Sequence, residues 1–212
     1  KLTGIAPNQI TDAFGSDAFR YYFMKAIGFG SDGSFSWEDL SARYNAELAN
    51  GFGNLASRSI AMVKKYFDGV VPEPGKYLEA DNQVISTAQR AVTEADAAID
   101  QVAIHEAIQK SWLLVDELNN YITSQAPWVL AKDEANKERL ATVMYVIVEG
   151  LRVLNILLAP IMPKATGKLW AAIGEGELAA QTIASAANWG GTKSGFVLKE
   201  LEPLFPRVDQ AE

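Results

Sequence analysis

The segment Lys137–Leu158 constrains the fold more than any other, because it is apolar on almost every side. A helix that faces water keeps one polar side, so a helix without one is expected at the centre of a bundle. Glu149 and Arg152 interrupt the apolar run, which leaves it shorter than the roughly 18 residues that a membrane span needs. We therefore expect a mainly α fold in which other helices surround this segment, and no contact with a membrane.

Other segments have the apolar periodicity of helices that pack around such a centre. Ser36 and Asp39 form a capping-box pattern at the start of a long helix, which we expect from Phe35 to Tyr66. The remaining expected elements are a short helix from Pro7 to Gly15, one capped by Ser16 and running to about Ile27, helices at 80–100, from about Val102 to the residue before Pro127, and at Lys164–Ile173, and a C-terminal strap formed by Phe196, Val197, Leu198, Leu201, Leu204 and Phe205.

Composition narrows the class of function. The chain has 212 residues and a formal net charge of -7, whereas a protein that binds nucleic-acid backbone regardless of sequence needs a basic face. It contains no cysteine, which excludes disulfides and thiolate metal ligands and fits a reducing compartment. There is no signal-peptide pattern, so we expect a cytoplasmic location, and the absence of an initiator methionine suggests part of a longer protein.

Few residues could support catalysis or metal binding. His105 is the only histidine, and no second ligand stands at metal-binding spacing from it. A serine-type triad would need the same histidine, and nothing around it supports one. We expect no catalytic residue and no metal site in this chain.

A row of polar side chains follows the long helix. Asn50, Asn54 and Arg58 are spaced i, i+4, i+8, so their amide and guanidinium groups project along one line of the helix. Most polar stripes only face solvent. The alternative is directional hydrogen bonding to a ligand, although the pattern alone favours solvent.

Trp128 follows Pro127 at a predicted helix break. The ring either fills a gap between two helices or stays exposed, where the rigid proline can hold it. An exposed ring would offer a stacking platform for an unpaired base. Nearby asparagine and arginine side chains could then read the edges of the base.

Several ordered motifs resemble the C-terminal part of methionyl-tRNA synthetases, which are class I aminoacyl-tRNA synthetases. The resemblance covers nearly the whole chain. It rests on the segments Asp17–Tyr22 (DAFRYY), Arg43–Asn50 (RYNAELAN), Gly53–Arg58 (GNLASR), Gln125–Trp128 (QAPW) and Pro203–Val208 (PLFPRV).

The resemblance implies two regions and a binding site. Residues 1–34 would form a stem-contact region, and residues 35–212 an anticodon-binding helical bundle with a C-terminal strap. The family's anticodon-binding residues match Asn50, Asn54, Arg58, Pro127 and Trp128. In the implied mechanism the CAU anticodon unstacks, its first base stacks on the tryptophan, and the polar row reads base edges.

The resemblance also implies what the chain lacks. The full enzyme would activate methionine with ATP and magnesium and attach it to tRNA(Met), but the HIGH and KMSKS motifs of that reaction are not found here. The expected partners are the tRNA(Met) anticodon and the catalytic domain of the same enzyme. The additional C-terminal tRNA-binding domain of some relatives is also not found, which favours a monomer.

Three alternatives remain open at this point. The first is another class I synthetase with a similar bundle, although the spacing of Asn54 and Arg58 together with Pro127-Trp128 speaks against it. The second is a helical protein-interaction module that uses an exposed Trp128 as its anchor. The third is a general RNA binder, which the acidic charge makes less favourable.

Overall fold

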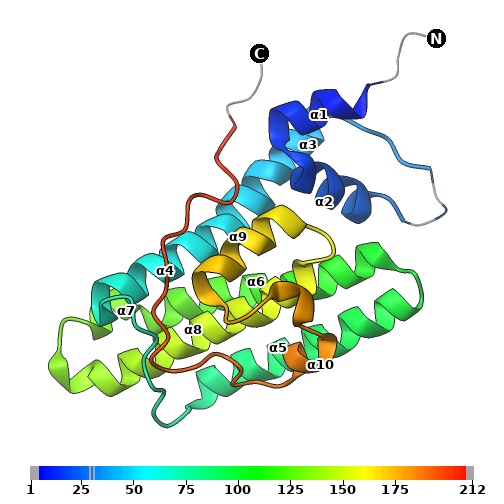
Figure 1. The fold of residues 1–212 in the computed structure, drawn as a ribbon. Coiled ribbons are helices and arrows are strands. Elements are labelled where there is room, and N and C mark those ends of the chain that lie inside the picture. The colour runs from blue at the N-terminus through cyan, green and yellow to red at the C-terminus, as the bar shows by residue number, and fades with distance from the viewer. Residues whose placement is uncertain (1–4, 29, 31, 209–212) are drawn as a thin grey trace.

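The computed structural model describes residues 5–28, 30 and 32–208 (Figure 1). This part of the chain has no β-strand beyond an isolated bridge between Val70 and Val197, which confirms the mainly α class. The α-helices are α1 (Pro7–Phe14), α2 (Ser16–Ala26), α3 (Trp37–Arg43), α4 (Asn54–Phe67), α5 (Glu79–Asp100), α6 (Ile104–Gln125), α7 (Pro127–Leu130), α8 (Lys137–Leu158), α9 (Pro163–Ile173) and α10 (Ile183–Ala187). The others are the π-helix η1 (Tyr44–Gly53) and the 3₁₀ turns η2 (Glu134–Asn136) and η3 (Leu178–Ala180).

Helix α8 lies at the centre of the bundle, as its sequence predicts. Every residue from 142 to 156 is buried, and α4, α5, α6 and α9 pack around it. By length and mean hydropathy this helix does qualify as a membrane span, contrary to the expectation from Glu149 and Arg152, but 94% of its apolar window is buried in the fold. Its apolar surface therefore forms the core of the bundle.

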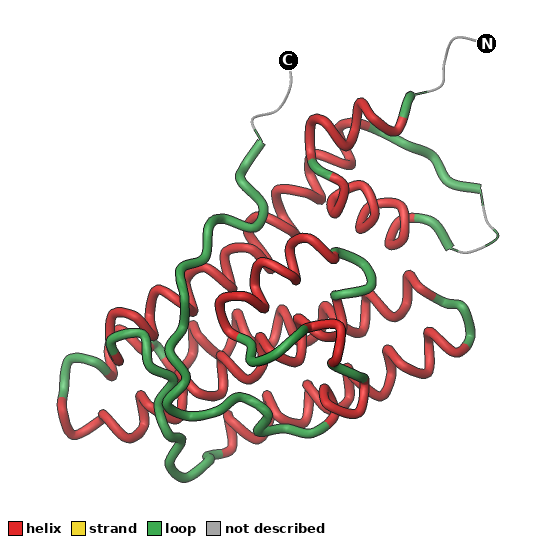
Figure 2. Tube along the Cα trace, viewed as in Figure 1, coloured by secondary structure: helices red, strands yellow, loops and turns green. Residues whose placement is uncertain are grey.

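Helices α5 and α6 form a hairpin that packs against α8 (Figure 2). Gly150 of α8 allows a close approach, because a Cβ atom there would lie 2.7 Å from Cδ2 of Leu118 in α6. Helix α6 begins two residues later than expected from the sequence. The backbone of Val102 has a positive φ of 60°, which is incompatible with the right-handed helix.

The long helix expected at 35–66 is continuous but is not a uniform α-helix. Its middle ten residues, Tyr44–Gly53, form the π-helix η1, which joins α3 to α4. Gly53 fits the wide turn, because a Cβ atom there would lie 2.8 Å from the carbonyl oxygen of Leu48. The π segment thus sets the direction in which α4 presents the predicted polar row.

The predicted helix ends are mostly confirmed. The Ser36 hydroxyl accepts a hydrogen bond from the amide of Asp39 at 3.3 Å, and α4 ends where Asp68 turns left-handed with φ 52°. The predicted cap of α2 is wrong by one residue. Gly15, with φ 85°, occupies the cap position, and Ser16 is the first helical residue without a capping bond.

Helices α1 and α2 are tied to the bundle at the junction of α8 and α9. The buried carboxylate of Asp17 accepts a hydrogen bond from the amide of Ala165 at 2.6 Å. The Arg20 guanidinium donates to the carbonyl oxygens of Ile161 at 2.9 Å and Pro160 at 2.7 Å. These bonds hold the N-terminal helices against the α8–α9 corner through polar contacts.

The C-terminal segment runs back along the bundle, shown from orange to red in Figure 1. Its backbone pairs with the connector after α4, where the Val71 amide donates to the Phe196 carbonyl at 2.9 Å and the Leu198 amide to the Gly69 carbonyl at 2.8 Å. Most predicted strap residues pack on the core, but Val197 is exposed. Its side chain points away from the bundle because its neighbours on either side face inward.

A buried ion pair between Glu149 and Arg152 of α8 holds this C-terminal segment. The Glu149 carboxylate accepts hydrogen bonds from Arg152 at 2.7 and 2.8 Å and from the amides of Gly190, Gly191 and Thr192 at 2.7 to 3.0 Å. Burial pushes the pKa of Glu149 upward, but its bonds to Arg152 outweigh that effect and hold the pKa below its usual value. The carboxylate is therefore ionised at neutral pH.

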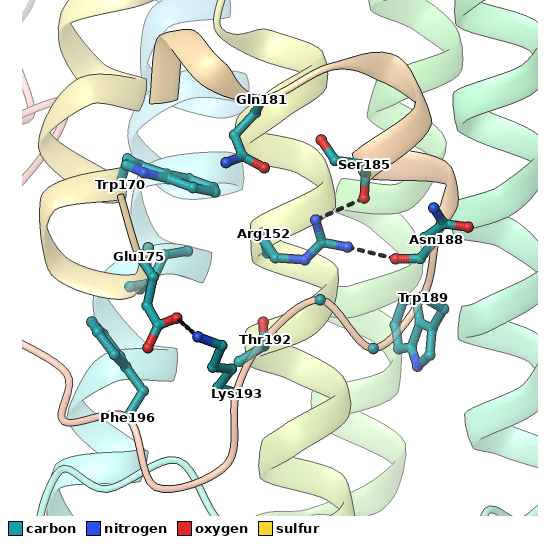
Figure 3. A pocket seen from close by; sticks show the side chains of 14 residues that line it. Arg152, Trp170, Glu175, Gln181, Ser185, Asn188, Trp189, Thr192, Lys193 and Phe196 are labelled. Atoms are coloured by element: carbon teal, nitrogen blue, oxygen red, sulfur yellow. Dashed lines mark hydrogen bonds and ion pairs between the residues drawn. The ribbon is translucent and has the colours of Figure 1, made fainter. Parts of the chain in front are cut away.

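A cavity of about 340 Å³ lies beside this pair, between α9 and the C-terminal segment. Trp170, Gln181 and Phe196 line it, and the Lys193–Glu175 ion pair stands at its rim (Figure 3). None of the predicted site residues lines this cavity.

Candidate nucleic-acid interface

The predicted polar row begins in η1 and continues along α4. The side chains of Asn50 and Asn54 are exposed, and that of Arg58 is half-buried. The structure thus keeps the three residues on the outer side of the helix, as their spacing predicts. Whether they contact a ligand stays a prediction.

Arg58 is held by a residue that sequence reasoning missed. Its Nη2 atom donates a hydrogen bond to Oδ1 of Asn119 on α6 at 2.7 Å, and the Asn119 amide nitrogen donates to the carbonyl of Val115 at 3.0 Å. Two contacts therefore fix the amide that positions the guanidinium.

Arg58 also has hydrogen-bonding capacity to spare. Among the described residues it has no carboxylate partner, and its buried Nε–H has no acceptor. Burial lowers the pKa of Arg58, but a guanidinium remains protonated at neutral pH. A half-buried cation with no acidic partner among the described residues is suited to donate hydrogen bonds to a base edge or a phosphate oxygen.

A groove of about 280 Å³ runs between the polar row and the C-terminal segment. Asn50, Asn54 and Ser57 line one side, and residues 203–207 the other. Arg207 closes one part of it by donating from Nε at 3.2 Å and from Nη2 at 2.7 Å to Oδ1 of Asn50. The segment thus adds a cation to the row, and sequence reasoning did not assign Arg207 although it lies in the PLFPRV motif.

Trp128 is exposed at the turn between α6 and α8. Ala126 adopts a left-handed conformation with φ 43°, and Pro127 begins α7 with its side chain buried. Trp128 itself is 46% exposed, so it does not fill a gap between helices. Its ring offers a flat apolar surface to solvent.

The Arg58 end of the polar row lies beside the part of α6 that leads to Trp128. The Arg58–Asn119 bond connects the row to the last turns of α6. Gln125, the end of α6, lies six positions after Asn119, which is about 9 Å along a helix. Trp128 follows three residues later in α7, the helix labelled at the left end of the bundle in Figure 1.

The described residues provide no metal centre, because they contain no group of three or more His, Cys, Asp or Glu side chains that could hold an ion. His105 lies half-buried on α6 beside Glu106, with 3.8 Å between their nearest nitrogen and oxygen atoms. The site instead combines amides, guanidinium groups and an aromatic face. These groups suit the recognition of unpaired bases.

Comparison with known proteins identifies the family. Residues 81–204 match the family described as the anticodon-binding domain of tRNA ligase, and residues 1–60 match class I tRNA synthetases (M). The chain is 45% identical to methionine–tRNA ligase of Streptomyces coelicolor over 99% of its own length and 40% of that protein. It is 40% identical to the same enzyme of Caldanaerobacter subterraneus over 97% of its length and 32% of that protein.

Solved structures agree with this assignment. The fold is similar to Mycobacterium tuberculosis methionyl-tRNA synthetase in its apo form, with a TM-score of 0.89, 36% identity and coverage of 97% of this chain and 41% of that one. The complex of that enzyme with methionyl-adenylate gives a TM-score of 0.90 at 35% identity, with coverage of 96% and 40%. The chain spans between 32% and 41% of the length of these relatives. It belongs to the family of anticodon-binding domains of tRNA ligases and corresponds to the C-terminal part of methionyl-tRNA synthetases.

Proposed function

We propose that this chain recognises the anticodon of tRNA(Met) for a methionine–tRNA ligase. The observation that carries the proposal is the Arg58–Asn119 bond, which joins the polar row to α6, the helix that ends three residues before the exposed Trp128. In this proposal an unstacked base lies on the ring, and Asn54 and Arg58 bond to base edges. Asn50 is already bonded to Arg207, so this pair would rearrange or act together.

The same proposal places the chain within a larger enzyme. Residues 1–34 would contact the tRNA stem beside the catalytic domain, and residues 35–212 would bind the anticodon. Methionine activation with ATP and magnesium would occur in the catalytic domain, while the cytoplasmic, monomeric enzyme positions tRNA(Met) through this chain. The relative solved with methionyl-adenylate supports adenylate chemistry in that enzyme, and the identified ligases favour this function over a protein-interaction module.

Replacing Arg58 with glutamine should reduce discrimination between tRNAs more than it reduces charge-driven binding. An arginine that reads a base contributes about 1–3 kcal/mol to the preference for that base. We expect the ratio of affinities for a CAU tRNA and one with a changed anticodon to fall by about 5- to 150-fold, measured by binding titration at fixed salt.

The matched control is Lys65→Gln, which removes the same charge from an exposed side chain on the same helix. This variant should slightly weaken the binding of both tRNAs and leave the ratio of their affinities unchanged. If Arg58→Gln instead weakens the binding of both tRNAs equally, Arg58 contacts the phosphate backbone and the proposed base recognition is wrong.

A further inference from the structure

The turn that carries Trp128 is linked to the bundle by a buried polar network. The Asp81 carboxylate on α5 is fully buried and receives two hydrogen bonds from the Arg139 guanidinium, at 2.6 and 2.9 Å. It also accepts from the Tyr121 hydroxyl and from the amide of Leu78. All the bonding positions of this carboxylate are therefore occupied, which makes the network rigid.

The opposite charges of Asp81 and Arg139 also stabilise this network. Burial pushes the pKa of Asp81 upward, but its hydrogen bonds, chiefly from Arg139, outweigh burial and hold the pKa below its usual value. Asp81 is thus ionised and paired with the guanidinium at neutral pH. Arg139, on α8, cannot leave this position without exposing a buried charge, which is costly.

Arg139 extends the network to the end of α6. Its Nη2 atom donates to Oε1 of Gln125 at 2.6 Å. Gln125 is the last residue of α6, one residue before the left-handed turn at Ala126. One guanidinium therefore connects the rigid Asp81 site to the residue from which the Trp128 turn departs.

The Arg139–Gln125 bond differs from the other hydrogen bonds of the turn because it reaches outside the turn, to α8. Among the described residues, the other hydrogen bonds of residues 125–133 all stay within residues 121–136. The apolar contacts of Pro127 and Leu130 also hold the turn, but apolar burial is not directional. The Arg139–Gln125 hydrogen bond, in contrast, is directional and constrains the orientation of the end of α6.

We propose that Arg139, acting through Gln125, is a positioning residue that fixes the orientation of the Trp128 ring for base stacking. The inference rests on the proposed function, because only a stacking role makes the direction of the ring matter. Arg139 does not touch the bound base in this scheme. It holds the end of α6, and α7 then presents the ring in a fixed direction.

The test uses Gln125→Met, because methionine has a similar length but no strong acceptor. Removing Arg139 would leave the buried Asp81 charge unpaired and could unfold the chain, whereas Gln125→Met keeps the Asp81–Arg139 pair. We expect its affinity for an RNA stem-loop with a CAU anticodon to fall by about fivefold, part of the loss expected on removing the ring. Thr123→Ala removes a nearby exposed hydroxyl that donates to the backbone carbonyl of Asn119 within α6 and does not contact Gln125, so this variant should bind as the unmodified chain does.

A double-mutant cycle separates positioning from general stability. In a Trp128→Ala background, Gln125→Met should cause no further loss of affinity, because the ring that it orients is gone. An equal loss in both backgrounds would show that Gln125 acts independently of the ring and would overturn the inference.

A second readout needs no RNA. With fluorinated tryptophan in the chain, the ¹⁹F signal that disappears in Trp128→Ala identifies this ring among the five tryptophans. Gln125→Met should shift or broaden that signal and leave the other four unchanged. An unchanged signal would overturn the positioning role while leaving the proposed function intact. If Trp128→Ala binds RNA normally, the proposed function fails, and the stacking role of the network fails with it.

Discussion

Replacing Arg152 with methionine should lower the free energy of unfolding by about 3–5 kcal/mol, because removing one partner of a buried pair leaves the other charge uncompensated. Glu149 would keep its three amide donors, but it would lose the guanidinium that neutralises it. Arg152 also bonds the carbonyls of Ser185 and Asn188 at 2.9 Å, so the C-terminal segment loses two further attachments. Urea denaturation followed by circular dichroism at neutral pH measures the effect.

The control for this variant is Lys193→Gln, which breaks the exposed Lys193–Glu175 pair at the rim of the same cavity. Exposed pairs contribute about 0–1 kcal/mol, so this change should be nearly neutral. The pKa of Glu149 is depressed in the folded state, so its contribution to stability is present above the unfolded pKa of about 4.3 and is lost as the pH falls from there through the lower, folded-state pKa. Equal destabilisation by the two variants at neutral pH would contradict the role given to the buried pair.

Replacing Trp128 with alanine should weaken binding of a CAU tRNA by about 5- to 150-fold, the range that corresponds to the loss of one base–aromatic stacking contact. The ring is 46% exposed, so the variant should remain folded. Trp128→Phe keeps a flat ring and should recover part of the affinity. Binding titrations at one stated salt concentration, with the melting temperature measured in parallel, give both quantities.

The neighbouring Val129 provides the control for Trp128. It is 53% exposed on the same turn, so Val129→Ala removes apolar surface without removing an aromatic face. We expect its tRNA affinity to match that of the unmodified chain. If Trp128→Ala unfolds the protein, the ring belongs to the core, and if it binds tRNA normally, stacking at this position is wrong.

Much of the fold could be predicted from sequence, because local patterns determine it. The all-round apolar character of residues 137–158 placed α8 at the centre, and Ser36 marked the start of the long helix. The π-helix at Tyr44–Gly53 could not be predicted. It depends on the close approach of Gly53 to the Leu48 carbonyl and on packing against Phe205 from the distant C-terminal segment, which helical periodicity does not contain.

The candidate site, like the fold, could be predicted only in part from the sequence. Helical spacing was enough to put Asn50, Asn54 and Arg58 on one side of a helix. The partners that hold them come from far along the chain, since Asn119 lies 61 residues from Arg58 and Arg207 lies 157 residues from Asn50. Such pairings follow from the tertiary packing, so one sequence does not reveal them. The anticodon-binding role of these residues stays a prediction.

If the proposed function is right, this chain distinguishes the CAU anticodon from other anticodons. The most direct test titrates the unmodified chain, at one fixed salt concentration, with a tRNA stem-loop carrying CAU and with the same stem-loop carrying a changed anticodon. We expect tighter binding of the CAU form, by about fivefold or more, because base-edge contacts at one position alone contribute about 1–3 kcal/mol. Equal binding of the two stem-loops would contradict it.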